Sequence, residues 1–171
     1  MTFISDSLNR IKPSATMVIT AKATQLKREG KKVIGLSSGE PDFDTPQHVK
    51  QAAIDAINSG YTKYTNIEGI PELRQSIVEK FKKDNDLNYD VSNVIVGTGG
   101  KQILFNALMS SLNKDDEVII PAPYWVSYPD MTLLAGGKPI FVDCSSETNF
   151  KLTGEALEKV VTKNSKWLIL N

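Results

Sequence analysis

The chain has 171 residues, 40% of them apolar, and its 20 basic and 20 acidic side chains give a formal net charge of zero. This length predicts one domain, or one domain with part of another, and enough apolar residues for a sizeable core. Zero net charge argues against a general binder of nucleic-acid backbones, which needs a basic excess, although a local anion site stays open.

A disulfide framework, a metal centre and a membrane segment are all poorly supported. Cys144 is the single cysteine and His48 the single histidine, and they lie in different segments, so they predict neither a nucleophile pair nor a metal-ligand cluster. We expect Cys144 to be a small buried residue at a strand end. The start of the chain lacks the features of a signal peptide, and no run of about 18 apolar residues occurs. A reducing, cytoplasmic location is therefore expected.

The first ninety residues predict helices separated by turn-rich loops. Ser14 stands where it can cap a first helix and Gly30 where it can end it, while Thr45 and Pro46 fit the cap and first turn of a second. In chain order we expect an arm over 1–13, a helix over 14–29, a short strand over 33–36, a loop to residue 44, a helix ended by Gly60, an irregular loop over 61–70, and a helix that begins at Pro71.

From residue 93 onward, short apolar runs alternate with amphipathic stretches. Strands are expected at 94–96, 118–120, 140–142 and 167–170, and helices at 103–112, 124–135 and from Thr153 to 161. The second strand is expected to end at Pro121. This alternation predicts βαβ units and a mostly parallel sheet, whose strands are apolar throughout because both faces are buried. The fold class is therefore α/β.

The last predicted strand ends one residue before Asn171, the final residue of the sequence. In an open parallel sheet, ligand-binding loops follow the carboxyl ends of the strands. Such a loop should begin where this sequence stops, so we expect the chain to be a segment of a longer polypeptide.

A glycine-rich segment, Gly97–Lys101, joins a predicted strand to a predicted helix. Glycines allow a close backbone approach to an anion, and the first N–H groups of a helix attract phosphate. A Walker loop would need glycine at Ile95 and a hydroxyl residue at Gln102, and a dinucleotide fingerprint would need glycine at Gln102. Two alternatives remain, a site for one phosphate group and a glycine turn without a ligand.

Two other segments also follow predicted strands. Prolines 121 and 123 would hold Trp125 near the carboxyl ends of the strands, where its indole could stack on a flat heteroaromatic ring or could simply be a core or interface residue. Gly39 could offer its backbone N–H to a carboxylate or could be an ordinary turn glycine.

Five motifs together resemble the class I aminotransferases, and they closely resemble bacterial aspartate aminotransferases of the branch that often also uses prephenate. The resemblance covers essentially the whole chain. The motifs are Ser38-Gly39-Glu40-Pro41-Asp42-Phe43-Asp44-Thr45-Pro46, Thr62-Lys63-Tyr64-Thr65, Gly69-Ile70-Pro71-Glu72-Leu73-Arg74, Gly99-Gly100-Lys101-Gln102 and Pro121-Ala122-Pro123-Tyr124-Trp125-Val126-Ser127-Tyr128-Pro129.

This resemblance implies a fold-type-I transferase that depends on pyridoxal 5'-phosphate and works as a homodimer. The implied architecture is a three-layer α/β/α domain with a mostly parallel sheet, incomplete in this chain. Residues 1–45 would form the N-terminal arm and part of a small domain, and residues 46–171 would form the N-terminal part of the large cofactor-binding domain.

The resemblance also implies roles for cofactor-binding residues. Gly99, Gly100 and Lys101 match the segment that holds the cofactor phosphate, and Trp125 matches the aromatic residue that stacks on the pyridine ring. Tyr64 matches a tyrosine that reaches the phosphate bound by the partner subunit, so each site would need two chains.

For the substrate, the resemblance implies that Gly39 contacts the α-carboxylate and that Trp125 lies beside the amino acid. Lys12 matches a position linked to prephenate recognition, and the alternative is a solvated surface lysine.

The implied activity belongs to amino-acid metabolism. An amino group moves between L-aspartate, with prephenate or arogenate as a further substrate, and 2-oxoglutarate. The matching segment holds none of the family's catalytic residues, since the Schiff-base lysine, the aspartate at the pyridine nitrogen and the substrate-clamping arginine are missing. We therefore expect no turnover by these 171 residues alone. A non-catalytic truncated remnant and a nucleotide-binding α/β module are the alternatives.

Overall fold

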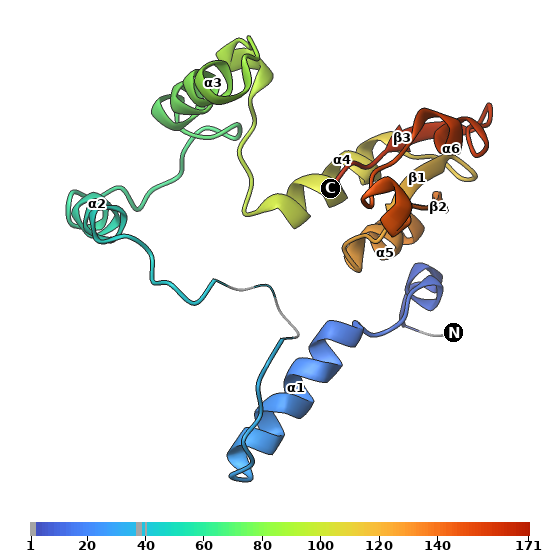
Figure 1. Ribbon diagram of the computed structural model, residues 1–171. Coiled ribbons are helices and arrows are strands. Elements are labelled where there is room, and N and C mark those ends of the chain that lie inside the picture. The colour runs from blue at the N-terminus through green and yellow to red at the C-terminus, as the bar shows by residue number, and fades with distance from the viewer. Residues whose placement is uncertain (1–2, 37–38, 40) are drawn as a thin grey trace. The chain divides into compact units, whose positions relative to one another are not determined.

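The computed structural model describes residues 3–36, 39 and 41–171. The chain divides into two compact units, one formed by residues 1–38 with 101–171 and one by residues 39–100 (Figure 1). The division falls between Gly100 and Lys101, at the start of a helix.

The first unit contains a three-stranded sheet of β1 (Glu117–Ala122), β2 (Lys138–Asp143) and β3 (Ser165–Leu168). The strand order is β2-β1-β3, and β1 pairs with both neighbours in parallel. The predicted parallel sheet is confirmed. Its central strand, β1, is nearly devoid of exposed surface from Glu117 to Ile120 because it has a neighbour on each side.

Helices α5 (Ser127–Leu134) and α6 (Gly154–Glu158) connect the strands. The connection from β1 to β2 and the connection from β2 to β3 cross the sheet in opposite directions. Right-handed crossovers therefore require the two helices on opposite faces, and Figure 1 shows α5 and α6 on opposite sides of β1. Thr153 caps α6 as predicted, since its Oγ1 accepts the N–H of Ala156 at 3.2 Å, but the helix is shorter than expected.

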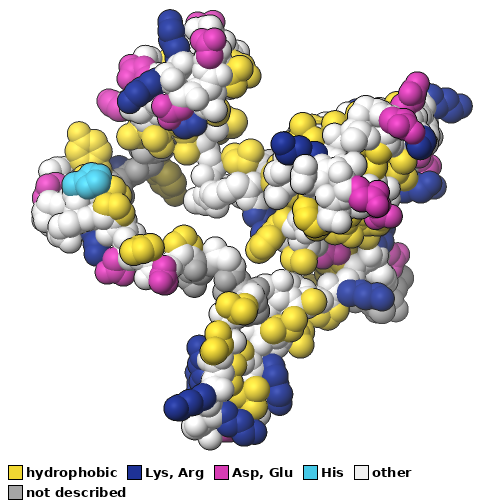
Figure 2. All heavy atoms as spheres, in the orientation of Figure 1, with side chains coloured by type: hydrophobic (Ala, Val, Ile, Leu, Met, Phe, Trp, Pro, Cys, Tyr) yellow, Lys and Arg dark blue, Asp and Glu magenta, His cyan; other side chains and the backbone are white. Residues whose placement is uncertain are grey.

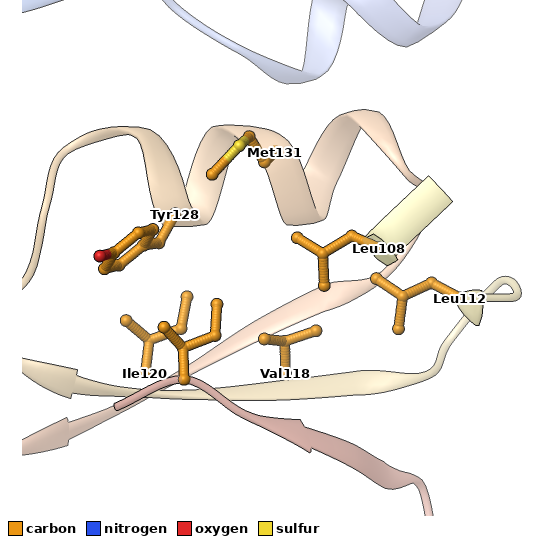
Figure 3. Close-up of a cluster of buried hydrophobic side chains, with 7 residues drawn as sticks. Leu108, Leu112, Val118, Ile120, Tyr128 and Met131 are labelled. Atoms are coloured by element: carbon orange, nitrogen blue, oxygen red, sulfur yellow. The ribbon is translucent and has the colours of Figure 1, made fainter. Parts of the chain in front are cut away.

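A compact core fills the space between the sheet and the helices α4 (Gly100–Ser111) and α5 (Figure 3). Val118 and Ile120 point from β1 toward Tyr128 and Met131 of α5, and Leu108 of α4 joins them. Ile119, between them in sequence, points to the other face and is also buried, as the alternation of side chains along a strand requires. Both faces of β1 are therefore covered.

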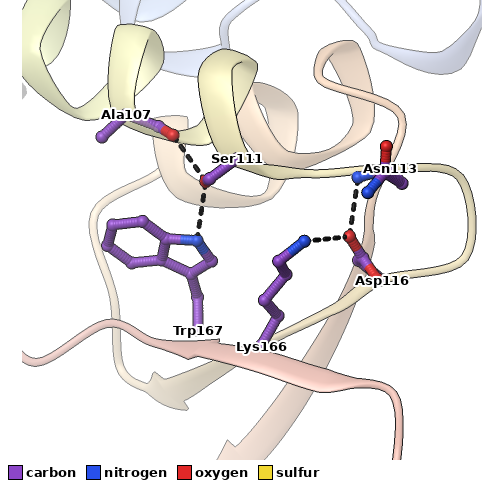
Figure 4. A network of polar contacts seen from close by, with 6 residues as sticks. All are labelled: Ala107, Ser111, Asn113, Asp116, Lys166 and Trp167. Carbon is purple, nitrogen blue, oxygen red and sulfur yellow. Dashed lines mark hydrogen bonds and ion pairs between the residues drawn. The ribbon is translucent and has the colours of Figure 1, made fainter.

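The pairing of β1 with β3 contains one irregularity. Glu117 pairs with Ser165 and Val118 with Trp167, so Lys166 is an extra residue on β3, as in a β-bulge. Figure 4 shows the result: Lys166 reaches the carboxylate of Asp116 at 2.9 Å, and the indole N–H of Trp167 donates to Ser111 Oγ at 2.9 Å. These two contacts link β3 to the end of helix α4 and to the loop before β1.

The N-terminal part of the first unit comprises a short 3-10 helix, η1 (Asp6–Arg10), and α1 (Ala15–Arg28). Ser14 occupies the N-cap position of α1, although its side chain makes no capping bond. The strand predicted over 33–36 is wrong, because this segment is an extended coil with no partner strand among the described residues. An apolar run becomes a strand only when another strand satisfies its N–H and C=O groups.

The second unit contains α2 (Gln47–Asn58), α3 (Pro71–Asn85) and a 3-10 turn, η2 (Val91–Asn93). Pro71 is the first residue of α3, as predicted, whereas Pro46 and not Thr45 is the N-cap of α2. Apolar side chains of this unit lie at the surface in Figure 2, including several over α2 and α3. None of its described residues is buried.

The strand predicted at Val94–Val96 is also wrong. Its segment is coil, and the Val96 N–H donates to the carbonyl of Glu68 at 2.9 Å, which is one isolated bond and no ladder. Boundaries in the sheet region differ as well: β1 continues through Pro121 to Ala122, and α5 begins at Ser127 and not at Tyr124. The last strand, predicted at 167–170, covers Ser165–Leu168. Pro121 is tolerated because the pairing of β1 with β3 ends at Ile119, so a missing N–H at Pro121 costs no bond to β3.

Cys144 is buried directly after β2, as predicted. A third 3-10 turn, η3 (Ser146–Thr148), follows it. Within the described part of the chain, no helix is long and apolar enough to cross a membrane, and no group of three or more His, Cys, Asp or Glu side chains is arranged to hold a metal ion.

Candidate functional site

Two of the predicted site residues, Lys101 and Trp125, lie together in the first unit. The Lys101 ammonium nitrogen is 5.8 Å from the centroid of the Trp125 ring, within the range of a cation–π interaction. Trp125 keeps 44% of its surface exposed. A positive charge thus lies over the ring of a partly exposed indole, an arrangement that can attract a flat ligand carrying negative charge.

The position of Trp125 follows from the exit of the chain at the carboxyl end of β1. Pro121, Ala122 and Pro123 lead out of the strand, and the Ala122–Pro123 peptide bond is cis. The Ala122 carbonyl accepts the N–H of Cys144 at 2.9 Å, and the Trp125 carbonyl accepts the N–H of Tyr128 at 3.1 Å. The segment between β1 and α5 is therefore anchored at both of its ends.

Tyr128 and Asn171 form a contact that sequence reasoning did not single out. Tyr128 is buried in the core, and its hydroxyl donates to Asn171 Oδ1 at 2.5 Å. Asn171 also lines a hollow of about 270 Å³ with Leu170, residues 121–123 and residues 150–152. The only available signal was position, because both residues follow strands at their carboxyl ends, where ligand loops of parallel sheets gather.

Gly99 and Gly100 lie in the turn for which a phosphate site is predicted. Gly99 has a φ of +96°, a conformation that favours glycine, and a Cβ built there would meet no atom within 4 Å. Helix α4 begins at Gly100. The N–H of Gly99 donates to the carbonyl of Gly97 at 2.9 Å, so the N–H groups that can attract negative charge are those at the start of this 12-residue helix.

The remaining predicted residues are exposed. Gly39 and Tyr64 belong to the second unit, as do Gly99 and Gly100. Ser38 and Glu40, which flank Gly39 in its motif, lie outside the described residues. Tyr64 lines an open hollow of about 390 Å³ with residues 59–61, Lys63 and Thr65. Lys12 lies in the first unit between η1 and α1, and within the described ranges it makes no hydrogen bond or ion pair.

Asp116 precedes β1, at the strand end opposite Trp125. The N–H of Asn113 donates to its carboxylate at 2.7 Å and the ammonium of Lys166 lies 2.9 Å away, and these contacts lower the pKa of Asp116 below its ordinary value. The cluster holds the amino end of the sheet, far along the strand from Lys101 and Trp125, so we assign it a structural role (Figure 4).

The family described as aminotransferase class I and II matches residues 31–171, which include the glycine turn, Lys101 and Trp125. The chain belongs to this family. Its recognition from five sequence motifs is confirmed.

Relatives from several bacteria are similar over the full chain. A probable aspartate/prephenate aminotransferase of Rickettsia bellii is 59% identical over all 171 residues, which span 43% of that relative. An aspartate/prephenate aminotransferase of Cereibacter sphaeroides is also 59% identical and is covered to the same extent, 43%. The chain thus spans less than half the length of these aminotransferases.

Solved structures of aspartate aminotransferases are also similar to this chain. An aspartate aminotransferase of Rhizobium meliloti matches 98% of this chain and 42% of its own, with a TM-score of 0.92 and 49% identity. That of Thermus thermophilus, solved with maleate, matches 99% of this chain and 44% of its own, with a TM-score of 0.95 and 44% identity. The α/β fold predicted from the sequence is therefore the fold of aspartate aminotransferases.

Proposed function

We propose that this chain is the N-terminal part of an aminotransferase that moves an amino group between L-aspartate and 2-oxoglutarate with pyridoxal 5'-phosphate as cofactor, and that prephenate and arogenate form a further substrate pair. The observation that carries the proposal is the ammonium of Lys101 over the ring of the partly exposed Trp125. The names of the aspartate/prephenate aminotransferases that the chain resembles support the choice of substrates.

The residues present fit the cofactor. Its phosphate group is doubly charged near neutral pH, and the start of α4 at Gly100 offers N–H donors, with the Lys101 ammonium one residue further on. Its flat pyridine ring suits the exposed indole of Trp125. When bound, the cofactor supplies an electron sink for charge that develops at the amino acid Cα.

The other roles belong to the same proposal. Gly39 would offer its N–H to the substrate α-carboxylate, Lys12 would recognise prephenate, and Tyr64 would reach the cofactor phosphate in the partner subunit of a homodimer. Residues 1–45 would form the arm and part of a small domain, and residues 46–171 part of the large domain. We propose a cytoplasmic location.

We further propose that these 171 residues do not complete a turnover. The family's anchoring lysine, which also moves the proton at Cα, is expected outside this segment, and Lys101 serves the phosphate instead. After incubation with pyridoxal 5'-phosphate and borohydride reduction, peptide mass spectrometry should therefore find no single stoichiometrically labelled lysine. Full labelling of one lysine would contradict this part of the proposal.

Cofactor binding is tested by fluorescence. The chain has two tryptophans, so the Trp167→Phe variant leaves Trp125 as the sole indole emitter. Pyridoxal 5'-phosphate should quench this emission at lower concentration than pyridoxal, which lacks the phosphate. Lys101→Ala should weaken the binding of pyridoxal 5'-phosphate by about tenfold, the order expected for one charge-assisted contact.

Lys114→Ala is the matched control, because Lys114 is an exposed lysine beyond the opposite end of α4. It should leave the quenching unchanged. If pyridoxal and pyridoxal 5'-phosphate quench equally, or if both lysine variants behave alike, residues 99–101 are not a phosphate site.

A further inference from the structure

Tyr128 contacts both segments that leave the carboxyl end of the sheet. Its main-chain N–H donates to the carbonyl of Trp125 in the segment after β1, at 3.1 Å. Its hydroxyl donates to Asn171 Oδ1 in the segment after β3, at 2.5 Å. One residue therefore links the proposed ring-stacking indole to the end of the neighbouring strand.

The Tyr128 side chain has little freedom to move. It is only 8% exposed and packs in the core against Ile120 and Met131 (Figure 3). Its carbonyl accepts the hydroxyl of Thr132 at 2.9 Å, and Thr132 has no exposed surface. The N–H, the carbonyl and the hydroxyl of Tyr128 are thus all bonded, so its ring is held by packing and by polar contacts together.

The hydroxyl makes a bond that packing alone does not need. A phenol buried without a partner costs stability, and phenylalanine would fill the same space without that cost. Asn171 lines the hollow of about 270 Å³ beside Pro121–Pro123, the segment that leads to Trp125. The polar contact therefore lies at the ligand end of the sheet, on the side where Trp125 leaves β1.

We propose that Tyr128 and Asn171 are a positioning pair that holds the Trp125 indole over the ring of the cofactor. The inference rests on the proposed function, since it assigns these two residues to the orientation of the same site. Neither residue is a catalytic residue, because each acts through the segment that carries Trp125.

The test uses the 171-residue chain with Trp167→Phe, so that Trp125 alone reports binding. Tyr128→Phe and Asn171→Ala should each lower the affinity for pyridoxal 5'-phosphate, measured by quenching, about three- to tenfold, the order expected for one hydrogen bond. The double variant should be no weaker than either single variant. Asn171→Asp keeps an acceptor oxygen and should restore most of the affinity.

A second readout separates positioning from a loss of structure. The affinity for inorganic phosphate, measured by calorimetry, should stay unchanged in all these variants, because the pair acts on the indole and not on the glycine turn. A general loss of structure would weaken the binding of both pyridoxal 5'-phosphate and inorganic phosphate. Tyr124→Phe is the matched control: Tyr124 stacks on Phe141 at 5.1 Å, and among the described residues its hydroxyl makes no hydrogen bond. The Tyr124→Phe variant should bind pyridoxal 5'-phosphate and inorganic phosphate with the affinities of the parent.

The outcomes are distinct. If the parent does not bind pyridoxal 5'-phosphate, the proposed function fails and the inference falls with it. If the parent binds and Tyr128→Phe or Asn171→Ala binds equally well, the positioning role alone is overturned. The same holds if phosphate affinity drops in parallel or if the effects of the two substitutions add.

Discussion

Residues 101–171 and residues 41–100 show two different ways in which apolar sequence is used. The buried apolar side chains of the described chain all lie between Leu108 and Ile169. In contrast, α2 and α3 have apolar side chains in a helical pattern, yet Val49 and Ile57 remain exposed, and no described residue of their unit is buried. A periodic pattern determines which face of a helix is apolar, but burial requires an element that packs on it.

The second unit is held locally by polar and aromatic contacts around α3. The guanidinium of Arg74 donates to the carbonyl of Val94 at 3.0 Å and to that of Val91 at 2.6 Å. Phe81 and Tyr89 meet edge to face, 5.9 Å between their ring centroids. These contacts fix the segment that follows α3, although no described residue of this unit is buried. We therefore expect substitutions in the sheet region to have the largest effects on stability.

The largest expected effect separates these two regions directly. Ile120→Ala should lower the free energy of unfolding by about 2–5 kcal/mol, because it opens a cavity where the side chain has 0% exposure. Ile57→Ala makes the same chemical change at a side chain that is 62% exposed, and it should alter stability by no more than about 0.5 kcal/mol. Urea unfolding followed by far-ultraviolet circular dichroism measures both. Equal losses of unfolding free energy in the two variants would mean that Ile57 of α2 is buried against another element.

A smaller effect should come from the bond between Trp167 and Ser111. Ser111→Ala leaves the part-buried indole N–H without its acceptor and should cost about 1–3 kcal/mol. Ser110 is the matched control, since its hydroxyl also bonds to the Ala107 carbonyl, at 3.1 Å, but accepts nothing from Trp167. Ser110→Ala should be near neutral. If the two serine variants unfold at the same urea concentration, the indole bond contributes nothing.

The smallest effect concerns Asp116 and depends on pH. Its pKa is lowered by the Asn113 N–H and by Lys166, so its carboxylate stabilises the fold above the unfolded pKa of about 4. This stabilisation is lost as the pH falls through the lower pKa of the folded state. Asp116→Asn should therefore be less stable than the parent at pH 7, and the difference should close toward pH 2.

Asp115→Asn controls for the loss of one negative charge. Asp115 has a φ of +71°, which asparagine tolerates well, so the backbone is not disturbed. Its urea midpoint should follow that of the parent at every pH. A difference between Asp116→Asn and the parent that persists at pH 2 would contradict the assignment to ionisation.

Helices could be predicted from the sequence because apolar spacing and capping residues lie within the helix itself or next to it. The helices at 15–28, 47–58 and 71–85 follow from apolar spacing, proline and glycine. The segments 33–36 and 94–96 were misassigned as strands because their β-branched composition indicates a preference, while a strand also needs a partner. Only the sheet region supplies such partners, around β1.

The candidate site was partly predictable for a similar reason. Lys101 and Trp125 each follow a run of apolar residues in a recognisable motif, and the structure brings them together. The bond between Tyr128 and Asn171 joins residues 43 positions apart, so no local pattern indicates it. Their meeting depends on the parallel alignment of β1 and β3, which places both strand ends at one edge of the sheet.

The extra residue on β3 has a consequence for every side chain after it. If Lys166 were paired with Val118 in a regular ladder, Trp167 would stand opposite Ile119 and share the far face of the sheet with it. The insertion shifts the phase of the strand by one position, so Trp167 pairs with Val118 and turns toward α4, and Leu168 pairs with Ile119. A β3 strand that kept Lys166 in the ladder would have to repack both faces of the sheet, and its tryptophan would no longer reach Ser111.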